Sequence, residues 1–194
     1  MPIRKFKTPL KKVRKWIEDD SLDIWCEDEV HFQQYGSRCR MWVPPEVKEP
    51  VLMHNPTRES IGYFGAVRLR DGKFVYQRED EVFNKETFWS FLKTLRKKSC
   101  HSKKRVIVIL DNAKYHHANL HKEWRNDCED QFHCEFLPPY SPELNPAERI
   151  WKLTRRLCIH NRYFPKLLDV VGLVEPQFDM WSRGNDELRK LCKI

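Results

Sequence analysis

The sequence contains no long hydrophobic run. Its longest purely aliphatic stretch, residues 106–110, is far shorter than the roughly 20 apolar residues that a transmembrane helix requires. The basic N-terminus also lacks the apolar segment of a secretory signal. These two absences argue against membrane-spanning and secreted proteins, and they predict an intracellular protein of the cytoplasm.

The sequence also lacks a Cys-x-x-Cys motif. Its seven cysteines are odd in number and scattered, which favours free thiols in a reducing compartment over a disulfide framework. Histidines and cysteines in the second half of the chain suggest zinc, but their spacing matches no common zinc finger. This set consists of His116, His117, His121, Cys128, His133 and Cys134. Zinc is therefore the minor interpretation of this region.

Acidic residues are fewer than basic ones. The formal net charge is +8 and the isoelectric point is about 9.1, a balance that favours a polyanionic partner but does not determine the fold. The first 15 residues carry seven basic residues and no acid. Residues 1–20 could form an arm that follows phosphates or a solvated, frayed terminus, and the sequence does not separate these two interpretations.

The chain does contain a regular succession of strand-like and helix-like segments. A length of 194 residues fits one domain. Hydrophobic periodicity and the hairpin signal Asp71-Gly72 predict the elements. We expect strands at about 22–27, 61–70, 73–77, 105–110 and 132–137, and helices at 84–98, 116–129, 146–160 and beyond Pro165, the last one kinked or split at Pro176.

These elements predict an α/β fold in which one mixed five-stranded sheet carries helices on both faces. The catalytic domain should span residues 21–165, with helices of residues 166–194 packed on it. Residues 36–60 lack periodicity and contain four prolines, so they should form a long irregular excursion that includes Trp42. The apolar strand at 105–110 should be central and parallel to a neighbour.

A proline-rich stretch at residues 137–151 leads directly into a helix. Its prolines restrict both their own φ angles and the residues before them, so the loop should be rigid. Asn145 is the expected N-cap, Pro146 the first helical residue and Glu148 the third. The loop and helix together would point Glu148 in a fixed direction. A capping box would favour Glu at the same position for local reasons alone.

Three acids could act together. Asp28 and Asp111 are expected at strand ends and Glu148 at a helix start, and ligands of α/β sheets bind at the carboxyl ends of strands. Hard oxygen ligands from separate elements suit Mg²⁺ or Mn²⁺, and two such ions can hold the attacking and leaving oxygens of a phosphoryl transfer. Turn formation and surface solvation remain open as ordinary explanations for the two aspartates.

Three motifs resemble the catalytic domain of DDE transposases, in particular the mariner-type superfamily and its bacterial insertion-sequence relatives. They are residues 27–32 with Asp28, residues 110–116 with Asp111 and His116, and residues 137–151 with Glu148. The resemblance covers roughly residues 20–165. It implies a ribonuclease-H-like fold and two Mg²⁺ (or Mn²⁺) ions held by Asp28, Asp111 and Glu148. It also implies DNA cleavage at element ends followed by strand transfer into target DNA.

The resemblance also implies partners. The excursion at 36–60 corresponds to a loop that clamps a partner subunit, so Trp42 would belong to a homodimer contact. Family members usually begin with a helix-turn-helix region, which would here be a separate or frameshift-fused chain segment. The alternatives are a non-catalytic remnant that binds DNA or a full-length transposase, and a nuclease acting on RNA–DNA hybrids.

Basic residues surround Glu148 on its predicted helix. Lys152, Arg155 and Arg156 lie on or near the face of Glu148, and Arg149 is adjacent to it. A face that presents a metal ligand to double-stranded DNA would also meet phosphates, although a solvated charged face is the simpler alternative. By the resemblance, His116 would lie near the active site, where DNA contact and a structural role are both open. We expect Trp151 to pack in the core.

Overall fold

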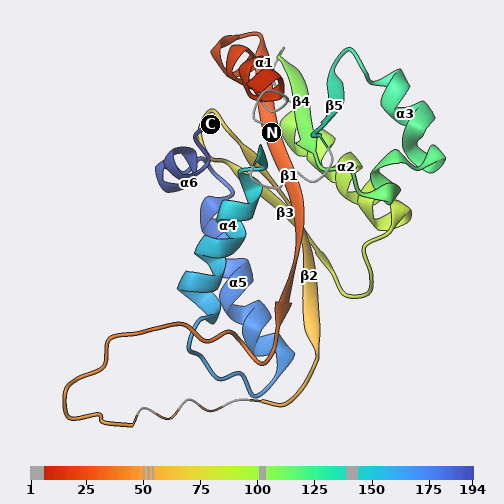
Figure 1. Cartoon of the computed structure of the whole chain (residues 1–194). Coiled ribbons are helices and arrows are strands. Elements are labelled where there is room, and N and C mark those ends of the chain that lie inside the picture. The colour runs from red at the N-terminus through yellow and green to blue at the C-terminus, as the bar shows by residue number, and fades with distance from the viewer. Residues whose placement is uncertain (1–6, 50, 52, 54, 101–103, 139–143) are drawn as a thin grey trace, which may run out of the picture.

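At the centre of the molecule lies one mixed β-sheet (Figure 1). The structure is a computed structural model, and it describes residues 7–49, 51, 53, 55–100, 104–138 and 144–194. The five strands lie in the order β3-β2-β1-β4-β5. Strands β1 to β3 pair antiparallel, whereas β4 is parallel to β1 and β5. The strands are β1 (Leu22–Gln33), β2 (Ser60–Arg68), β3 (Phe74–Glu79), β4 (Arg105–Leu110) and β5 (Phe132–Phe136).

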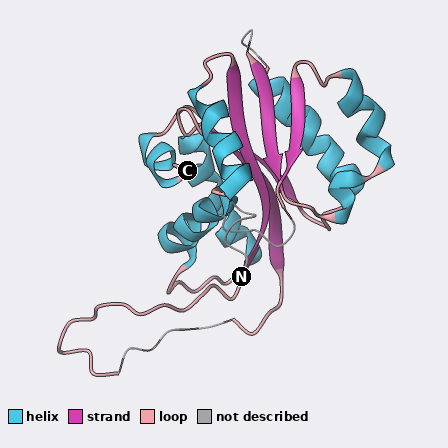
Figure 2. Cartoon of the chain, turned by 45° about the horizontal axis from the view of Figure 1, so that its top comes forward, coloured by secondary structure: helices cyan, strands magenta, loops and turns pink. Residues whose placement is uncertain are grey.

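Helices cover both faces of this sheet (Figure 2), as expected. The front face, as we call it, packs against α1, α4, α5 and α6 through residues such as Val13, Ile150 and Phe178. The back face packs against α2 and α3 through residues such as Phe88 and Trp124. The helices are α1 (Lys7–Glu18), α2 (Lys85–Ser99), α3 (Lys122–Asp127), α4 (Ala147–Thr154), α5 (Leu167–Trp181) and α6 (Asp186–Leu191). Short turns add the 3₁₀ segments η1 (Lys114–His117) and η2 (Asn119–His121) and the π-helical segment η4 (Arg155–Ile159).

Strand β1 is longer than the sequence predicted. It continues to Gln33, because β2 pairs with it along its whole second half. The parallel pairing with β4 ends earlier, at Cys26 opposite Ile109. The expectation that Asp28 ends the strand was therefore wrong. Asp28 lies inside β1, just beyond the point where β4 stops.

The prediction of one helix at 116–129 was also wrong. The chain forms η1 and η2, separated by an extended residue, Ala118, before the short helix α3 begins. The rings of His116 and His121 both pack on Phe88, with centroids 4.2 and 5.4 Å from that ring. Residues five apart point in different directions on a continuous α-helix. The break at Ala118 allows both rings to reach the core.

Proline does not break the C-terminal helix. Helix α5 runs through Pro176 without the split that was one of the two expected outcomes. An interior proline costs about 3 kcal/mol, and the helix buries an apolar stripe that offsets this cost. The stripe consists of Val170, Val171, Val174, Phe178 and Trp181.

The basic N-terminal region is helical from Lys7 onwards. Val13 of α1 is 6% exposed, and Trp16 packs against the front core. This part of the chain is thus neither an extended arm nor a frayed end, while residues 1–6 lie outside the described residues. None of the helices in the described part of the chain has the length and apolar character needed to cross a bilayer. All seven cysteines are free thiols, as expected.

The excursion between β1 and β2 reaches away from the body of the molecule (Figure 1). Its described residues between 38 and 59 contain no helix or strand, which confirms the irregular segment. A backbone hydrogen bond of 3.0 Å from Gln34 to the carbonyl oxygen of Glu59 closes its base. Trp42 is 100% exposed, so it does not pack in the core of its own chain.

Candidate functional site

Asp28, Asp111 and Glu148 come from neighbouring elements of the front layer. Asp28 follows Ile24 and Cys26 on the front side of β1, and Asp111 follows Ile107 and Ile109 in the same alternation of β4. Helix α4, which carries Glu148, packs across this face through its apolar residues. We call Asp28, Asp111 and Glu148 the front acids. Strands β1 and β4 are neighbours, so their two aspartates lie at the same end of the parallel pair.

Asn145 fixes the start of α4 against β1. Its side-chain amide donates a hydrogen bond of 2.6 Å to the carbonyl oxygen of Glu27, and its Oδ1 accepts one of 3.1 Å from the backbone N–H of Ala147. The helix begins at Ala147 with Pro146 as N-cap. Glu148 is therefore the second helical residue, one position earlier than expected, and Asn145 anchors the helix next to Asp28.

Trp151 connects the same helix to Asp28. Its indole N–H donates a hydrogen bond of 2.9 Å to Asp28 Oδ2, and the residue is only 3% exposed. Gly65 of β2 lies directly opposite Asp28, and a Cβ there would collide with the rings of Trp151 and Phe74. The expectation that Trp151 packs in the core is confirmed, but its hydrogen bond to Asp28 was not anticipated.

The environment of Asp28 opposes its ionisation. Burial, and then the negative charges of Glu29 and Glu148, raise the pKa of Asp28 to about 7, although the Trp151 hydrogen bond acts in the opposite direction. Glu148 is thus close enough to Asp28 for their charges to interact. Carboxylates that repel one another in this way are stabilised when a cation binds between them.

Asp111 differs from Asp28 in both exposure and charge. Its side chain is 52% exposed, and Oδ1 lies 2.9 Å from His116 Nδ1 and 2.8 Å from the backbone nitrogen of Ala113. These contacts, with His116 first, lower the pKa of Asp111 below its usual range. Asp111 is therefore ionised at neutral pH and held in a fixed orientation.

His116 is completely buried behind Asp111. Its side chain is 0% exposed, so the DNA contact considered for it is excluded in this conformation. Nε2 lies 2.9 Å from Glu29 Oε1, on the other side of the ring from Asp111. Burial alone would lower the pKa of His116, but its bonds to Asp111 and Glu29 raise it to about 10. His116 thus links the front acids to the back face.

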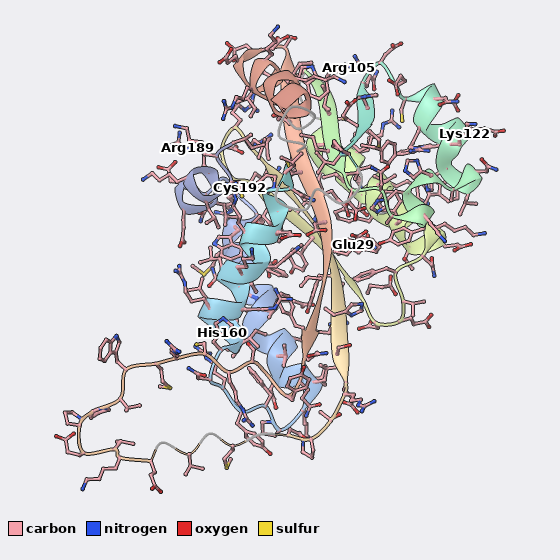
Figure 3. All side chains as sticks on the ribbon, viewed as in Figure 1. Glu29, Arg105, Lys122, His160, Arg189 and Cys192 are labelled. Atoms are coloured by element: carbon pink, nitrogen blue, oxygen red, sulfur yellow. The ribbon has the colours of Figure 1, made fainter. Side chains whose placement is uncertain are left out.

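The back face of β1 carries two further acids. Glu27 and Glu29 alternate with Asp28 along the strand, so their side chains point to the opposite side. Figure 3 places Glu29 on β1 between the two helical layers. Tyr115 donates a hydrogen bond of 2.6 Å to Glu29, whereas Glu27 is fully buried. We call Glu27, Glu29 and His116 the back cluster.

The basic residues of α4 and η4 have separate surroundings. Lys152 and Arg156 are exposed, as a role in binding phosphates would require. The guanidinium of Arg155 lies over the ring of Phe32 at 5.5 Å. Arg149 instead donates hydrogen bonds of 2.9 and 3.0 Å to the carbonyl oxygens of residues 191 and 193. Arg149 therefore holds the C-terminal helix in place.

The proline-rich stretch is only partly visible, since residues 139–143 lie outside the described residues. Where the stretch begins, the side-chain amide of Asn112 donates a hydrogen bond to the carbonyl oxygen of Leu137. A backbone bond of 2.8 Å joins Leu137 to Leu110. The end of β4 and the start of the stretch are thus fastened together beside Asp111.

Sequence reasoning missed Glu27, Glu29, Tyr115 and the contacts of Trp151. The alternation Glu27-Asp28-Glu29 could have placed two acids behind the sheet, if β1 had been continued past residue 27. Trp151 lies one helical turn after Glu148, so it was predictable as a neighbour of the same site. Nothing in the local sequence indicated that His116 would be buried.

Comparison with known proteins gives the family and the fold. The chain is 38% identical over 66 residues to an uncharacterized protein, y4pE/y4sA, of Sinorhizobium fredii, covering 34% of this chain and 45% of that protein. The Mos1 mariner paired end complex with Mn superposes with a TM-score of 0.68 at 15% identity, over 96% of this chain and 55% of that one. The catalytic domain of Mos1 mariner transposase superposes with a TM-score of 0.63 at 15% identity, over 96% of this chain and 82% of that one.

These likenesses confirm the ribonuclease-H-like fold that the sequence predicted. The chain spans 54% of the Mos1 chain in its strand transfer complex, so it corresponds to only part of that protein. The family model described as DDE superfamily endonuclease matches residues 23–170, well over half of the chain. This protein therefore belongs to the DDE superfamily endonucleases.

Proposed function

We propose that this chain is the catalytic domain of a transposase, which cuts DNA at the ends of a mobile element and joins them to target DNA. The observation that supports this proposal is the arrangement of the front acids. In this DDE endonuclease domain, Asp28 lies in β1, Asp111 follows the neighbouring strand β4, and Glu148 lies in the first turn of α4, which packs on the same face. Such a position suits ligand binding in sheets of this kind.

Two Mg²⁺ or Mn²⁺ ions are the proposed cofactors of the front acids. Carboxylate oxygens suit these hard cations, and the raised pKa of Asp28 indicates negative charge that a cation would offset. When bound, such ions activate a water or hydroxyl nucleophile and stabilise the leaving oxygen. The protein contributes orientation: Trp151 holds Asp28, His116 holds Asp111, and Asn145 positions the helix of Glu148.

Double-stranded DNA is the proposed substrate. Lys152 and Arg156 are exposed on the helical segment that follows Glu148, and the whole chain has a net charge of +8. Among the relatives in fold, one is a Mos1 paired-end complex with left transposon end. Phosphate contacts of this kind would orient the scissile strand without reading its sequence.

We further propose that the enzyme works as a homodimer. The excursion at 36–60 would contact a partner subunit through Trp42, whose complete exposure leaves it free to do so. Recognition of the element ends would come from a helix-turn-helix region, separate or fused by frameshifting. Free cysteines and a DNA substrate fit a cytoplasmic protein.

The decisive experiment compares Glu148→Gln with the wild-type chain. DNA nicking and strand transfer are measured with Mg²⁺ or Mn²⁺ on duplexes that carry candidate ends. We expect the activity of the variant to fall more than about 100-fold. Residues that only support metal ligands usually contribute about 10- to 100-fold, so a larger loss indicates a direct ligand. Glu187→Gln is the matched control, because Glu187 also lies at the second position of its helix and is exposed on α6, away from the front acids.

Two results would contradict the proposal. Cleavage by Glu148→Gln at the wild-type rate would remove Glu148 from the active site. A wild-type chain that binds DNA or a full-length transposase, yet cleaves nothing with either ion, would instead be a non-catalytic regulator of transposition.

A further inference from the structure

The back cluster has the geometry of a metal site. One ligand atom from each of Glu27, Glu29 and His116 lies within 4.8 Å of the others. These side chains face the layer of α2 and η1, on the opposite side of β1 from Asp28. Figure 3 shows Glu29 at the middle of this long strand. One ion placed among the three groups could bind all of them after small side-chain rotations.

Glu27 provides the independent observation. The residue is 0% exposed, and among the described residues no hydrogen-bond donor reaches either of its carboxylate oxygens. An isolated carboxylate is very costly to bury unless a cation or a proton accompanies it. The hydroxyl of Tyr115 donates to the neighbouring Glu29. Both oxygens are therefore free to accept a metal ion or a proton.

His116 is oriented as a metal-binding histidine would be. Nδ1 lies 2.9 Å from Asp111 Oδ1, a contact in which the ring donates a proton to a carboxylate. The other nitrogen, Nε2, points to the back cluster and lies 2.9 Å from Glu29 Oε1. Histidines that bind metals commonly donate their second N–H to a carboxylate in this way.

We infer that Glu27, Glu29 and His116 bind one transition-metal ion of the Zn²⁺ class, separate from the ions proposed for the front acids. An imidazole nitrogen with two carboxylates suits Zn²⁺ better than Mg²⁺, which prefers oxygen ligands only. On binding, the ion takes the place of any proton on Nε2, and that proton is released to solvent. Tyr115 then serves as the outer partner of Glu29.

This site would also act on the front face. The ion would hold His116 from behind, and His116 in turn fixes the carboxylate of Asp111. The back metal would therefore be structural, and it would support the orientation of one front acid without touching DNA.

Zinc content is the direct test, in a chain whose front acids are disabled. Asp28→Asn and Glu148→Gln together remove two of the three front acids, while Asp111 stays to orient His116. After equilibration with Zn²⁺ and removal of the free ion, elemental analysis should find about one zinc per chain. Adding Glu27→Gln should abolish this binding, whereas adding Glu135→Gln should not, because Glu135 bonds to Lys12 and His133 instead.

Thermal unfolding gives a second readout that needs no DNA. At a free Zn²⁺ concentration 100-fold above Kd, the doubly substituted chain should unfold about 5–10 °C higher than in a chelator. The chain that also carries Glu27→Gln should show no such shift, and its melting point in the chelator reports whether it folds.

Equal zinc content with and without Glu27→Gln would overturn the inference and leave Glu27 as a protonated buried acid. Because every chain in this test lacks two front acids, the result is independent of the proposed transposase activity.

Discussion

Strand β1 has two faces with opposite properties, although the acids on them are consecutive in sequence. On the front face, Asp28 accepts a hydrogen bond from the indole of Trp151, and Asp111, at the end of the neighbouring strand, is half-exposed. On the back face, Glu29 is bonded to Tyr115 and His116, and Glu27 is sealed in the core. The front is therefore open to water and ligands, and the back is enclosed by the protein.

This difference indicates separate tasks for the two faces. A site that exchanges metal ions and DNA needs carboxylates with free coordination positions, as Asp28 and Asp111 have. A site that only holds other residues is better closed, because rigid outer partners keep the inner ligands oriented. His116 bonds to acids of both faces, Glu29 at the back and Asp111 at the front.

Removal of one acid from each face should have the largest effects. Asp111→Asn should lower the DNA cleavage rate more than about 100-fold, and Glu29→Gln about 10- to 100-fold, because Glu29 acts through His116. Cleavage rates measured over a range of Mg²⁺ concentrations should show that added ion partly rescues Glu29→Gln but not Asp111→Asn. Equal losses without rescue would mean that the back face takes part directly in the reaction.

The front face should also be the more sensitive to added volume. Gly65→Ala places a methyl group against Trp151 and Phe74, so Trp151 must leave Asp28 or the sheet must shift. We expect the free energy of unfolding to fall by about 3 kcal/mol, as measured by urea denaturation. Gly172→Ala is the control, since nothing lies within 4 Å of its added methyl group. That substitution in α5 should stabilise the protein by about 0.5–1 kcal/mol.

If Gly65→Ala keeps wild-type stability, the packing of Trp151 on β2 is looser than its contacts indicate. If it is destabilised but Asp28 retains its indole partner, the hydrogen bond does not depend on Gly65. Indole fluorescence of the two variants would separate these outcomes.

Sequence patterns predicted the front acids better than the back cluster. Alternation and apolar runs predict β1 and β4, and the proline-rich stretch predicts the start of α4. Only the pairing of β1 with β4, which the structure supplies, brings Asp28 and Asp111 to the same end of the sheet. The end of β1 was missed, because a run of acids at 27–29 resembles the end of a strand unless the pairing with β2 is known. Because β1 was ended too early, Glu27 and Glu29 were not assigned to its back face.

The surroundings of the two buried histidines could not be predicted either. His116 and His121 lie in a polar segment, and only the position of Phe88 on α2 explains why the chain breaks at Ala118. Likewise, Arg149 belongs to a basic helix in the sequence, but the C-terminal carbonyls beside it appear only after folding. Contacts between distant segments decide such cases, and local propensity carries no information about them.

The smallest expected effect concerns the charge of Asp28 itself. Its pKa is about 7 in the folded protein, against 3.8 for an unperturbed aspartate, so ionisation opposes folding. The contribution of this carboxyl to stability is therefore greatest below pH 3.8 and is lost as the pH rises to about 7. Asparagine does not titrate and can still accept the Trp151 hydrogen bond. Without metal, Asp28→Asn should be more stable than the wild type by about 1–2 kcal/mol at pH 8.

The pH dependence makes this prediction specific to the front face. Urea denaturation of both proteins in a chelator should give equal stabilities near pH 4, and a difference that grows up to about pH 7. Mg²⁺ should then reduce the difference in unfolding free energy between the two proteins at pH 8. The ion stabilises the wild type more than the variant, because the variant has lost one ligand of the ion. A gain that is the same at every pH would arise from packing. Only a gain that follows the ionisation of Asp28 agrees with a front face whose negative charge awaits a cation.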